Sequence, residues 1–315
     1  MGEALFQAKL ATIARDSSQR KTISVNGIET TYWFYPKRNS LSKIKRSIVF
    51  IHGYRGNHHG LEAIAGAIED FDVYIPDLPG FGYSAAFAGD HSVDHYASWL
   101  NTFIQSLKFG ETKPHLLGHS FGSIVVSAYA ARHDGIATLI LENPVASPAL
   151  KGPKAVMTAV AKGFFWLAGL LPENLGDGIL KSWPMVRGMS ILMAKTKNRA
   201  LRAWIHRQHD ENFNDFASRR VVNEAYRAST SECVGQWAQD FAIPTLVITG
   251  NLDDITSPKQ QRAMAATLRV PNRMVEHLGV GHLTHYEIPA EVAADIRLFL
   301  AGLQDKALKA PGHGS

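Results

Sequence analysis

The sequence has a single cysteine, Cys233, among its 315 residues. One cysteine excludes an internal disulfide framework and is typical of a reducing compartment. The segment around it, TSECVGQW, contains neither a neighbouring base nor a glycine corner. We therefore expect Cys233 to pack as a small apolar residue and not to act as a nucleophile.

Long hydrophobic runs are also missing. The nearest approach, residues 155–171, is interrupted by Lys162 and closed by Pro172, and a membrane-spanning helix needs ~20 apolar residues. The N-terminal residues are charged early and form no continuous apolar stretch, and Phe6 stands where a myristoylation signal has Ser or Thr. We predict a cytoplasmic protein without stable membrane insertion.

The excess of positive charge is small, because 33 Lys and Arg stand against 28 Asp and Glu. No nucleic-acid-binding motif accompanies these cations, so we expect a small-molecule substrate and no nucleic-acid partner. Residues 151–232 are the more basic part, with 13 Lys or Arg against 7 Asp or Glu. We interpret this excess as a solvated helical surface, and attraction of anionic substrates is the alternative.

Short apolar runs punctuate the chain and end in glycine, proline or polar residues. Continuous apolar runs indicate strands covered on both faces, as in a parallel sheet flanked by helices. Before them, Asn26-Gly27 joins two β-rich arms into a predicted hairpin. The sequence therefore predicts an α/β fold with a mostly parallel, doubly wound sheet and an N-terminal antiparallel hairpin. The runs are SIVFIHG, DVYIPDLPG, PHLLGHS, ATLILENP and PTLVITG.

The alternation of strands and helices stops near residue 145 and resumes near residue 243. Only helical patterns lie between, and an insertion there would cover the carboxyl ends of the strands, where such folds bind ligands. We predict a core domain (1–145 and 237–305), an all-helical cap (146–236), a last helix from Pro289 to about Leu303 and a flexible tail (306–315).

The segment GHSFG places Ser120 between a strand-like run and a helical pattern. A sharp strand-to-helix turn forces its central residue into a strained backbone state and points the hydroxyl outward. The flanking Gly118 and Gly122 are needed because a Cβ there would collide with the turn. We predict that Ser120 is a nucleophile.

A nucleophilic serine needs a base, and the base needs an orienting carboxylate. His282 follows the last strand in the glycine-rich loop GVGHLTHYEIP and is the predicted base, whereas we expect His285 to face the following helix. Asp253, three residues past Gly250, is the predicted acid. Asp254 and Glu142 remain alternatives.

A tetrahedral intermediate also needs donors for its oxyanion. The amide of Phe121, at a helix N-terminus, is one candidate, and the amide of Tyr54, after the glycine of FIHGYRG, is the other. The histidines at 52, 58 and 59 lack a metal-ligand spacing, and we expect no metal there. We interpret His206 and His209, which share a helix face, as polar surface.

Five segments, HGYRG, DLPGFGYS, GHSFG, GNLDDITSP and GHLTHYEIP, occur in an order that resembles the α/β-hydrolase fold-1 family. The resemblance covers about 45–145 and 243–303 and implies that the intervening region is the helical cap. Members that dehalogenate or open epoxides carry Asp at the nucleophile position, which Ser120 excludes here. The resemblance implies Ser120 as nucleophile, Asp253 as acid, His282 as base, and the Tyr54 and Phe121 amides as oxyanion hole.

Together these observations predict a serine hydrolase that acts through an acyl-enzyme on a small-to-medium apolar ester, without metal or organic cofactor. Residues 163–171, Trp183 and Trp204 are the candidate acyl-pocket residues in the cap. The alternatives are a C–C bond hydrolase using the same residues and a non-catalytic small-molecule-binding protein on the same scaffold.

Overall fold

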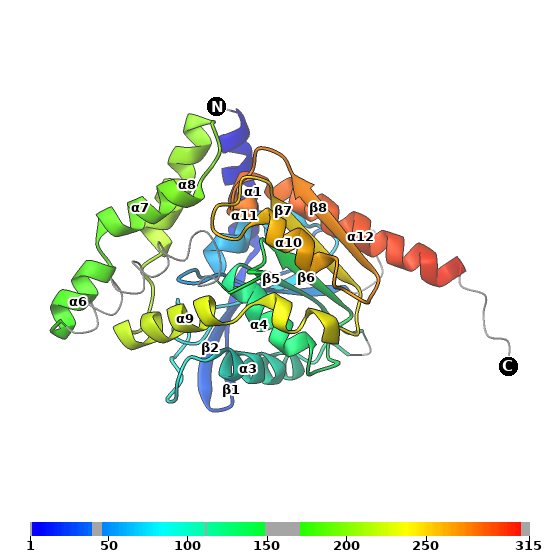
Figure 1. The fold of residues 1–315 in the computed structure, drawn as a ribbon, viewed down its shortest axis with the longest axis horizontal. Helices are drawn as coiled ribbons and strands as arrows, with labels where there is room; N and C mark the ends of the chain where they lie inside the picture. The colour runs from blue at the N-terminus through cyan, green and yellow to red at the C-terminus, as the bar shows by residue number, and fades with distance from the viewer. Residues whose placement is uncertain (1, 40–45, 111, 149–170, 310–315) are drawn as a thin grey trace.

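The computed structural model describes residues 2–39, 46–110, 112–148 and 171–309. An eight-stranded sheet forms its centre, in the order β1-β2-β4-β3-β5-β6-β7-β8 (Figure 1). β2 pairs antiparallel with β1 and with β4, and all other pairings are parallel, which confirms the predicted fold class. The strands are β1 (Gln19–Val25), β2 (Ile28–Tyr35), β3 (Ser47–Ile51), β4 (Asp72–Pro76), β5 (His115–His119), β6 (Thr138–Glu142), β7 (Thr245–Gly250) and β8 (Asn272–His277).

The predicted hairpin is present, and its turn explains it. Asn26 and Gly27 both have positive φ, 53° and 79°. Two such residues form a turn whose twist matches that of the flanking strands. Val25 consequently pairs with Ile28, and this register runs to Gln19 opposite Phe34.

Successive strand residues point to opposite faces of the sheet, and both faces are buried. In β3, Ile48 and Phe50 join the apolar cluster beneath α2 and α12, whereas Val49 and Ile51 join the cluster beneath α3 and α4. Burial on both faces explains why the strands read as continuous apolar runs. The helices of the core are α1 (Gly2–Ser17), η1 (His58–Leu61), α2 (Glu62–Ala67), α3 (Val93–Ser106), α4 (Phe121–Ala130), α10 (Pro258–Ala265), α11 (Thr284–Glu287) and α12 (Pro289–Lys309).

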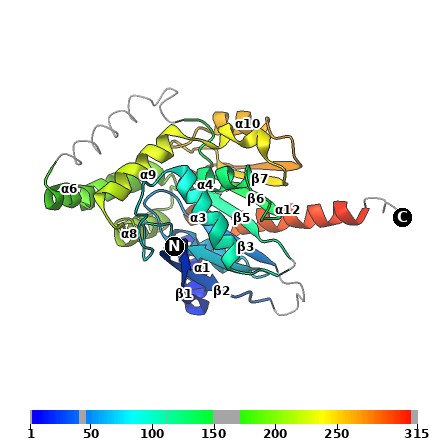
Figure 2. The same cartoon turned by 90° about the horizontal axis from the view of Figure 1, so that it is seen from below.

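Between β6 and β7 the described residues contain helices and no strand. In Figure 2, α6, α8 and α9 lie at the opposite side from the C-terminal end of α12. The only β contact of this region within the described chain is an isolated bridge between Phe81 and Phe216. The boundaries of the cap, 146–236, stay a prediction. The elements are α6 (Glu173–Leu180), α7 (Trp183–Met193), α8 (Arg199–Asn212), α9 (Arg219–Ser231), η2 (Val234–Gln236) and η3 (Ala238–Asp240).

Both ends of the chain are helical. The sequence analysis made no structural prediction for the first residues, where α1 packs on α2 and contacts α11 through the Gln7 side-chain amide, which donates to the Glu287 carbonyl at 3.0 Å. The last helix continues past Leu303 to Lys309, since the residues between them include no Gly or Pro to stop it. No described helix combines the length and apolar character needed to cross a membrane.

Candidate active site

Ser120 occupies the turn between β5 and α4 with φ 52° and ψ −116°, a backbone state that costs energy for a residue with a Cβ. The flanking glycines make this turn possible. A Cβ on Gly122 would lie 2.3 Å from the Ile51 carbonyl oxygen, and one on Gly118 would lie 2.5 Å from the Gly122 carbonyl oxygen. The steric role predicted for both glycines is confirmed.

Three of the predicted side chains meet at this turn. His282 Nε2 lies 2.8 Å from Ser120 Oγ, and His282 Nδ1 lies 2.9 Å from Asp253 Oδ2. A carboxylate oxygen only accepts, so Nδ1 carries the hydrogen and leaves Nε2 with a lone pair toward the serine hydroxyl. The imidazole is therefore held in the tautomer that can take a proton from Ser120.

Asp253 is a buried carboxylate with an unusually full set of donors. Oδ2 also accepts from the Asn143 amide at 2.9 Å and the Thr256 hydroxyl at 2.6 Å, and Oδ1 accepts from the backbone N–H groups of Ile255 and Thr256 at 2.8 and 2.9 Å. Burial acts to raise the pKa of Asp253, but the His282 imidazole and the Thr256 hydrogen bonds outweigh it and lower the pKa to about 2. Asp253 is thus ionised at neutral pH.

The sequence analysis missed two of these donors. The contact with Thr256 could have been predicted from the sequence, because an Asp side chain that accepts from the backbone amides two and three residues further on is a common turn motif. The contact with Asn143 could not have been predicted in this way, since Asn143 and Asp253 are 110 residues apart in the sequence.

The two alternative acids lie elsewhere. The Asp254 side chain is half exposed and pairs with Lys195 Nζ at 2.7 Å. Glu142 is fully buried and is hydrogen-bonded to the Thr284 hydroxyl, and among the described residues no hydrogen bond joins it to His282. Burial raises the pKa of Glu142 above its usual value.

The sequence suggested that His285 faces the following helix, but this prediction is wrong. Its Nδ1 lies 3.5 Å from Glu142 Oε1, and its ring centroid lies 4.1 Å from that of His119. The reason is the one-turn helix α11, which begins at Thr284 and turns the side chain back toward β6. Burial lowers the pKa of His285 to about 3, so this imidazole is neutral.

The two predicted oxyanion donors flank the turn. Phe121 is the first residue of α4, where an amide has no intrahelical acceptor. Tyr54 follows Gly53, whose added Cβ would lie 3.3 Å from Ser120 Cβ, so this loop closely approaches the serine. His52 braces the loop: its Nε2 accepts from the Leu78 amide, and its Nδ1–H donates to the Gly53 carbonyl, both at 2.9 Å.

A cavity of about 60 Å³ lies beside Ser120. Its lining combines the Ser120 and His282 side chains with apolar groups from both the core and the helices between β6 and β7. The apolar side chains are Leu61, Met193, Phe213 and Leu283.

Comparisons with known proteins identify the family of this chain. The family described as the alpha/beta hydrolase fold matches residues 46–289. The chain belongs to this family. The hydrolase is 25% identical to a lipase, "Lipase 3" of Moraxella sp., over 82% of this chain and 78% of that protein. It is also 25% identical to the 2-succinyl-6-hydroxy-2,4-cyclohexadiene-1-carboxylate synthase of Serratia proteamaculans, over 80% of this chain and 92% of that protein. A thermophilic esterase from Thermogutta terrifontis shares the fold, with a TM-score of 0.71 at 23% identity over 90% of this chain and 98% of that one.

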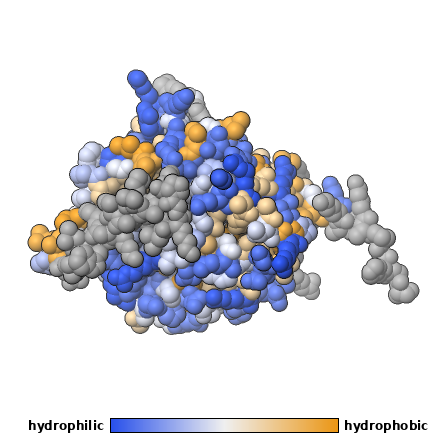
Figure 3. Space-filling model, in the orientation of Figure 1, coloured by the Kyte–Doolittle hydropathy of each residue, from blue (hydrophilic) through white to orange (hydrophobic). Residues whose placement is uncertain are grey.

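The acyl-pocket residues predicted for this hydrolase need correction. Trp183 is 60% exposed and stacks against Arg187, and Trp204 is buried against Tyr286, so neither lines the cavity. Most of the predicted segment, 163–170, lies outside the described residues. Figure 3 shows apolar atoms on the outer surface over α6 and α7, the helices that carry Trp183 and its exposed apolar neighbours.

The helical spacing of His209 suggested a surface residue, but its side chain is buried. It is only 4% exposed and lines the cavity, and Ser190 Oγ lies 2.7 Å from its Nδ1 and 2.6 Å from His206 Nδ1. The spacing gave the shared helix face of the two histidines, but it could not reveal that α7 covers that face. Burial lowers the pKa of His209 to about 3, so it presents a neutral ring to the cavity.

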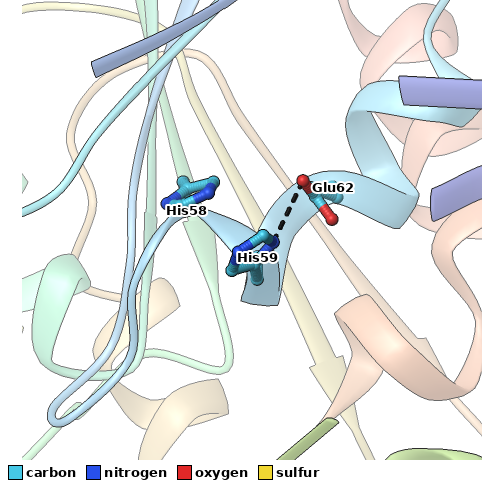
Figure 4. A group of neighbouring side chains, drawn as sticks. All are labelled: His58, His59 and Glu62. Carbon is cyan, nitrogen blue, oxygen red and sulfur yellow. Dashed lines mark ion pairs between the residues drawn. The ribbon is translucent and has the colours of Figure 1, made fainter. Parts of the chain in front are cut away.

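The histidines at 58 and 59 form a separate cluster with Glu62 (Figure 4). His58 Nδ1 lies 3.0 Å from Asp77 Oδ1, and His59 Nδ1 lies 3.1 Å from Glu62 Oε1, an ion-pair contact without hydrogen-bond geometry. Arg15 pairs with the other Glu62 oxygen at 2.8 Å. Because a guanidinium already neutralises the carboxylate, the cluster has the contacts of a structural ion-pair network.

Proposed function

We propose that this hydrolase cleaves carboxylic esters through an acyl-enzyme on Ser120. The observation that carries the proposal is the chain of contacts from the Ser120 hydroxyl through His282 to the ionised Asp253, on a strained turn beside a cavity. The lipase relatives support ester bonds as the target.

The chemistry follows from the assigned tautomer. His282 Nε2 takes the hydroxyl proton as Ser120 Oγ attacks the ester carbonyl carbon, and the amides of Tyr54 and Phe121 donate to the resulting oxyanion. The carbon–oxygen bond to the alcohol then breaks, and the alcohol leaves with the proton from His282. Water, deprotonated by His282, attacks the acyl-enzyme and releases the acid, which restores Ser120.

The cavity favours a small-to-medium apolar acyl group. Its apolar walls at Met193, Phe213 and Leu283 suit an alkyl chain, and the volume of about 60 Å³ limits its length. Neutral His209 adds one polar edge, suited to a hydrogen bond with an uncharged ester.

A second candidate is carbon–carbon bond chemistry with the same serine and histidine. The relationship to the Serratia synthase, which extends over 92% of that protein, favours keeping it as the rival. Such a reaction needs an acidic dienol-type substrate, whereas ester hydrolysis does not.

The test is a series of p-nitrophenyl esters from acetyl to dodecanoyl. We expect turnover with an optimum at the short end, and a loss of about 10⁴-fold in Ser120→Ala. Ser127→Ala is the matched control, because Ser127 lies buried on the same helix with no hydrogen-bond partner for its hydroxyl among the described residues. Inert esters of every length at high enzyme concentration would overturn the proposal, and turnover of a dienol substrate alone would favour the rival.

A further inference from the structure

Three side chains outside the Ser120–His282–Asp253 arrangement meet behind His282. His119 ends β5, Glu142 ends β6 and His285 lies in α11. Their possible ligand atoms all lie within 4.8 Å of one another. The side chains are 7%, 0% and 5% exposed, respectively, so the cluster is closed to bulk water.

Within the described chain, three polar atoms of this cluster lack hydrogen-bond partners, although Glu142 Oε1 contacts the Thr284 hydroxyl. Among the described residues, His119 Nδ1, Glu142 Oε2 and His285 Nδ1 are buried and accept or donate no hydrogen bond. Buried polar atoms are normally paired, and an unpaired one calls for an ion or a bound water. Three such atoms in one place therefore point to a ligand among them.

The spacing fits a metal ion. Nδ1 of His119 lies 3.6 Å from Glu142 Oε2, and Nδ1 of His285 lies 3.5 Å from Glu142 Oε1, both too long for hydrogen bonds. Two ligands ~2.0–2.1 Å from a tetrahedral Zn²⁺ lie about 3.3–3.4 Å apart. The two nitrogen–oxygen distances are therefore within a few tenths of an ångström of the distance between two ligand atoms of one Zn²⁺.

The other histidine–glutamate cluster, formed by His58, His59 and Glu62, has the same residue types but different partners. Asp77 pairs with His58 and Arg15 pairs with Glu62, which leaves one atom, His59 Nδ1, without a hydrogen bond among the described residues. The cluster at Glu142 has no such cation among the described side chains.

We propose that His119, Glu142 and His285 bind one divalent transition-metal ion, with Zn²⁺ as the best match to two imidazoles and a carboxylate. The ion has a route to the site, because His119 also lines the cavity beside Ser120.

A bound dication acts on the neighbouring base. The ring centroids of His119 and His282 are 5.2 Å apart, so the charge disfavours the imidazolium that forms when His282 takes the serine proton. Zn²⁺ binding should therefore inhibit ester hydrolysis. This consequence rests on the proposed function, whereas the binding itself does not.

The test is a titration of the untagged, metal-free full chain with Co²⁺, followed by its visible absorption, and with Zn²⁺, followed by calorimetry. We expect one ion per chain, and an affinity at least about tenfold weaker in Glu142→Gln and in His285→Asn. Circular dichroism of both variants checks folding, and either folded variant suffices for the comparison. His59→Asn, in the other cluster, should leave the affinity unchanged.

The binding test stands whether or not the protein hydrolyses esters. Binding that survives in His282→Asn supports the assigned site, while binding lost in that variant places the ion at the base and overturns it. No binding at millimolar Co²⁺ or Zn²⁺ also overturns the proposal, as does unchanged affinity in both ligand variants.

Discussion

Asp253 and Glu142 are two buried carboxyl groups at the ends of neighbouring strands, just past β7 and at the end of β6, and their pKa values shift in opposite directions. Their exposures are nearly equal, 4% and 0%, so burial alone does not separate them. Asp253 accepts five hydrogen bonds, one of them from His282, and its pKa falls to about 2. Burial dominates at Glu142, and its pKa rises. The donors around a buried carboxylate, more than its depth, decide whether it can serve as the anion behind a base.

A hydrogen-bond chain supports a neutral Glu142. The Thr284 hydroxyl contacts both Glu142 Oε1 and, at 2.6 Å, Asn143 Oδ1, but it has one hydrogen to donate. Both contacts are satisfied if protonated Glu142 donates to Thr284 and Thr284 donates to Asn143. The Asn143 amide then donates to Asp253, so one relay joins the neutral acid to the ionised one.

Of the substitutions that compare the two carboxyl groups, Asp253→Asn should have the largest effect. We expect kcat/KM for the best p-nitrophenyl ester to fall by about 10⁴-fold, because an amide carries no charge to stabilise the imidazolium and no longer fixes the His282 tautomer. Steady-state kinetics measure the loss. Asp254→Asn is the control, since its half-exposed side chain pairs with Lys195 and not with His282. A loss below about tenfold in Asp253→Asn would remove Asp253 from its assigned role.

Thr256→Val tests whether the hydrogen-bond donors around Asp253 stabilise its buried carboxylate. The substitution removes a hydroxyl that donates to Asp253, and it removes one of the two acceptors of the Gln261 side-chain amide, the one at 2.7 Å. Loss of one buried hydrogen-bond partner should lower the free energy of unfolding by about 1–3 kcal/mol. Urea denaturation of Thr256→Val and of the exposed Thr267→Val compares the two, and equal stabilities would contradict the account.

The stability of the protein should respond to pH in opposite senses at the two carboxylates. The pKa of Asp253 is lowered in the fold, from 3.8 to about 2. Its contribution, about 2 kcal/mol, is therefore present above pH 4 and is lost as the pH falls toward 2. The stability gap between wild type and Asp253→Asn, measured by urea denaturation at several pH values, should narrow over that range. A gap that stays constant would contradict the lowered pKa.

Glu142→Gln should have the smallest effect on activity. Glutamine mimics the protonated acid, so kcat/KM should stay within about tenfold of wild type, a change below about 1.4 kcal/mol. The raised pKa of Glu142 also predicts that wild-type stability declines as the pH rises above 4.5, through the pKa of the folded state. Glu142→Gln should lack that decline. A loss of activity as large as that of Asp253→Asn would make Glu142 the acid instead.

The sequence predicted the features that are local. Continuous apolar runs mark strands buried on both faces, and Gly118 and Gly122 mark a turn where a Cβ would clash. Ser120 directly follows β5, and His282 lies in the loop after the edge strand β8, so strand order in the sheet helps to bring the two side chains together.

The features it did not predict depend on what a distant element covers. Trp183 is a large aromatic residue of the kind that often lines pockets, but its side chain faces outward. His209 has the helical spacing of a surface residue, but it lies buried beneath α7. His285 turned toward Glu142 because of a one-turn helix that carries no cap signal. Hydrophobic periodicity predicts which residues share one face of a helix, but it does not predict which other element packs against that face.

The most direct test of the account is the rate at which a fluorophosphonate labels Ser120, followed by mass spectrometry of the adduct. The account predicts rapid labelling of Ser120 in the wild type and in Glu142→Gln, and labelling slowed by orders of magnitude in Asp253→Asn. No labelling of the wild type, or labelling lost in Glu142→Gln and retained in Asp253→Asn, would contradict it.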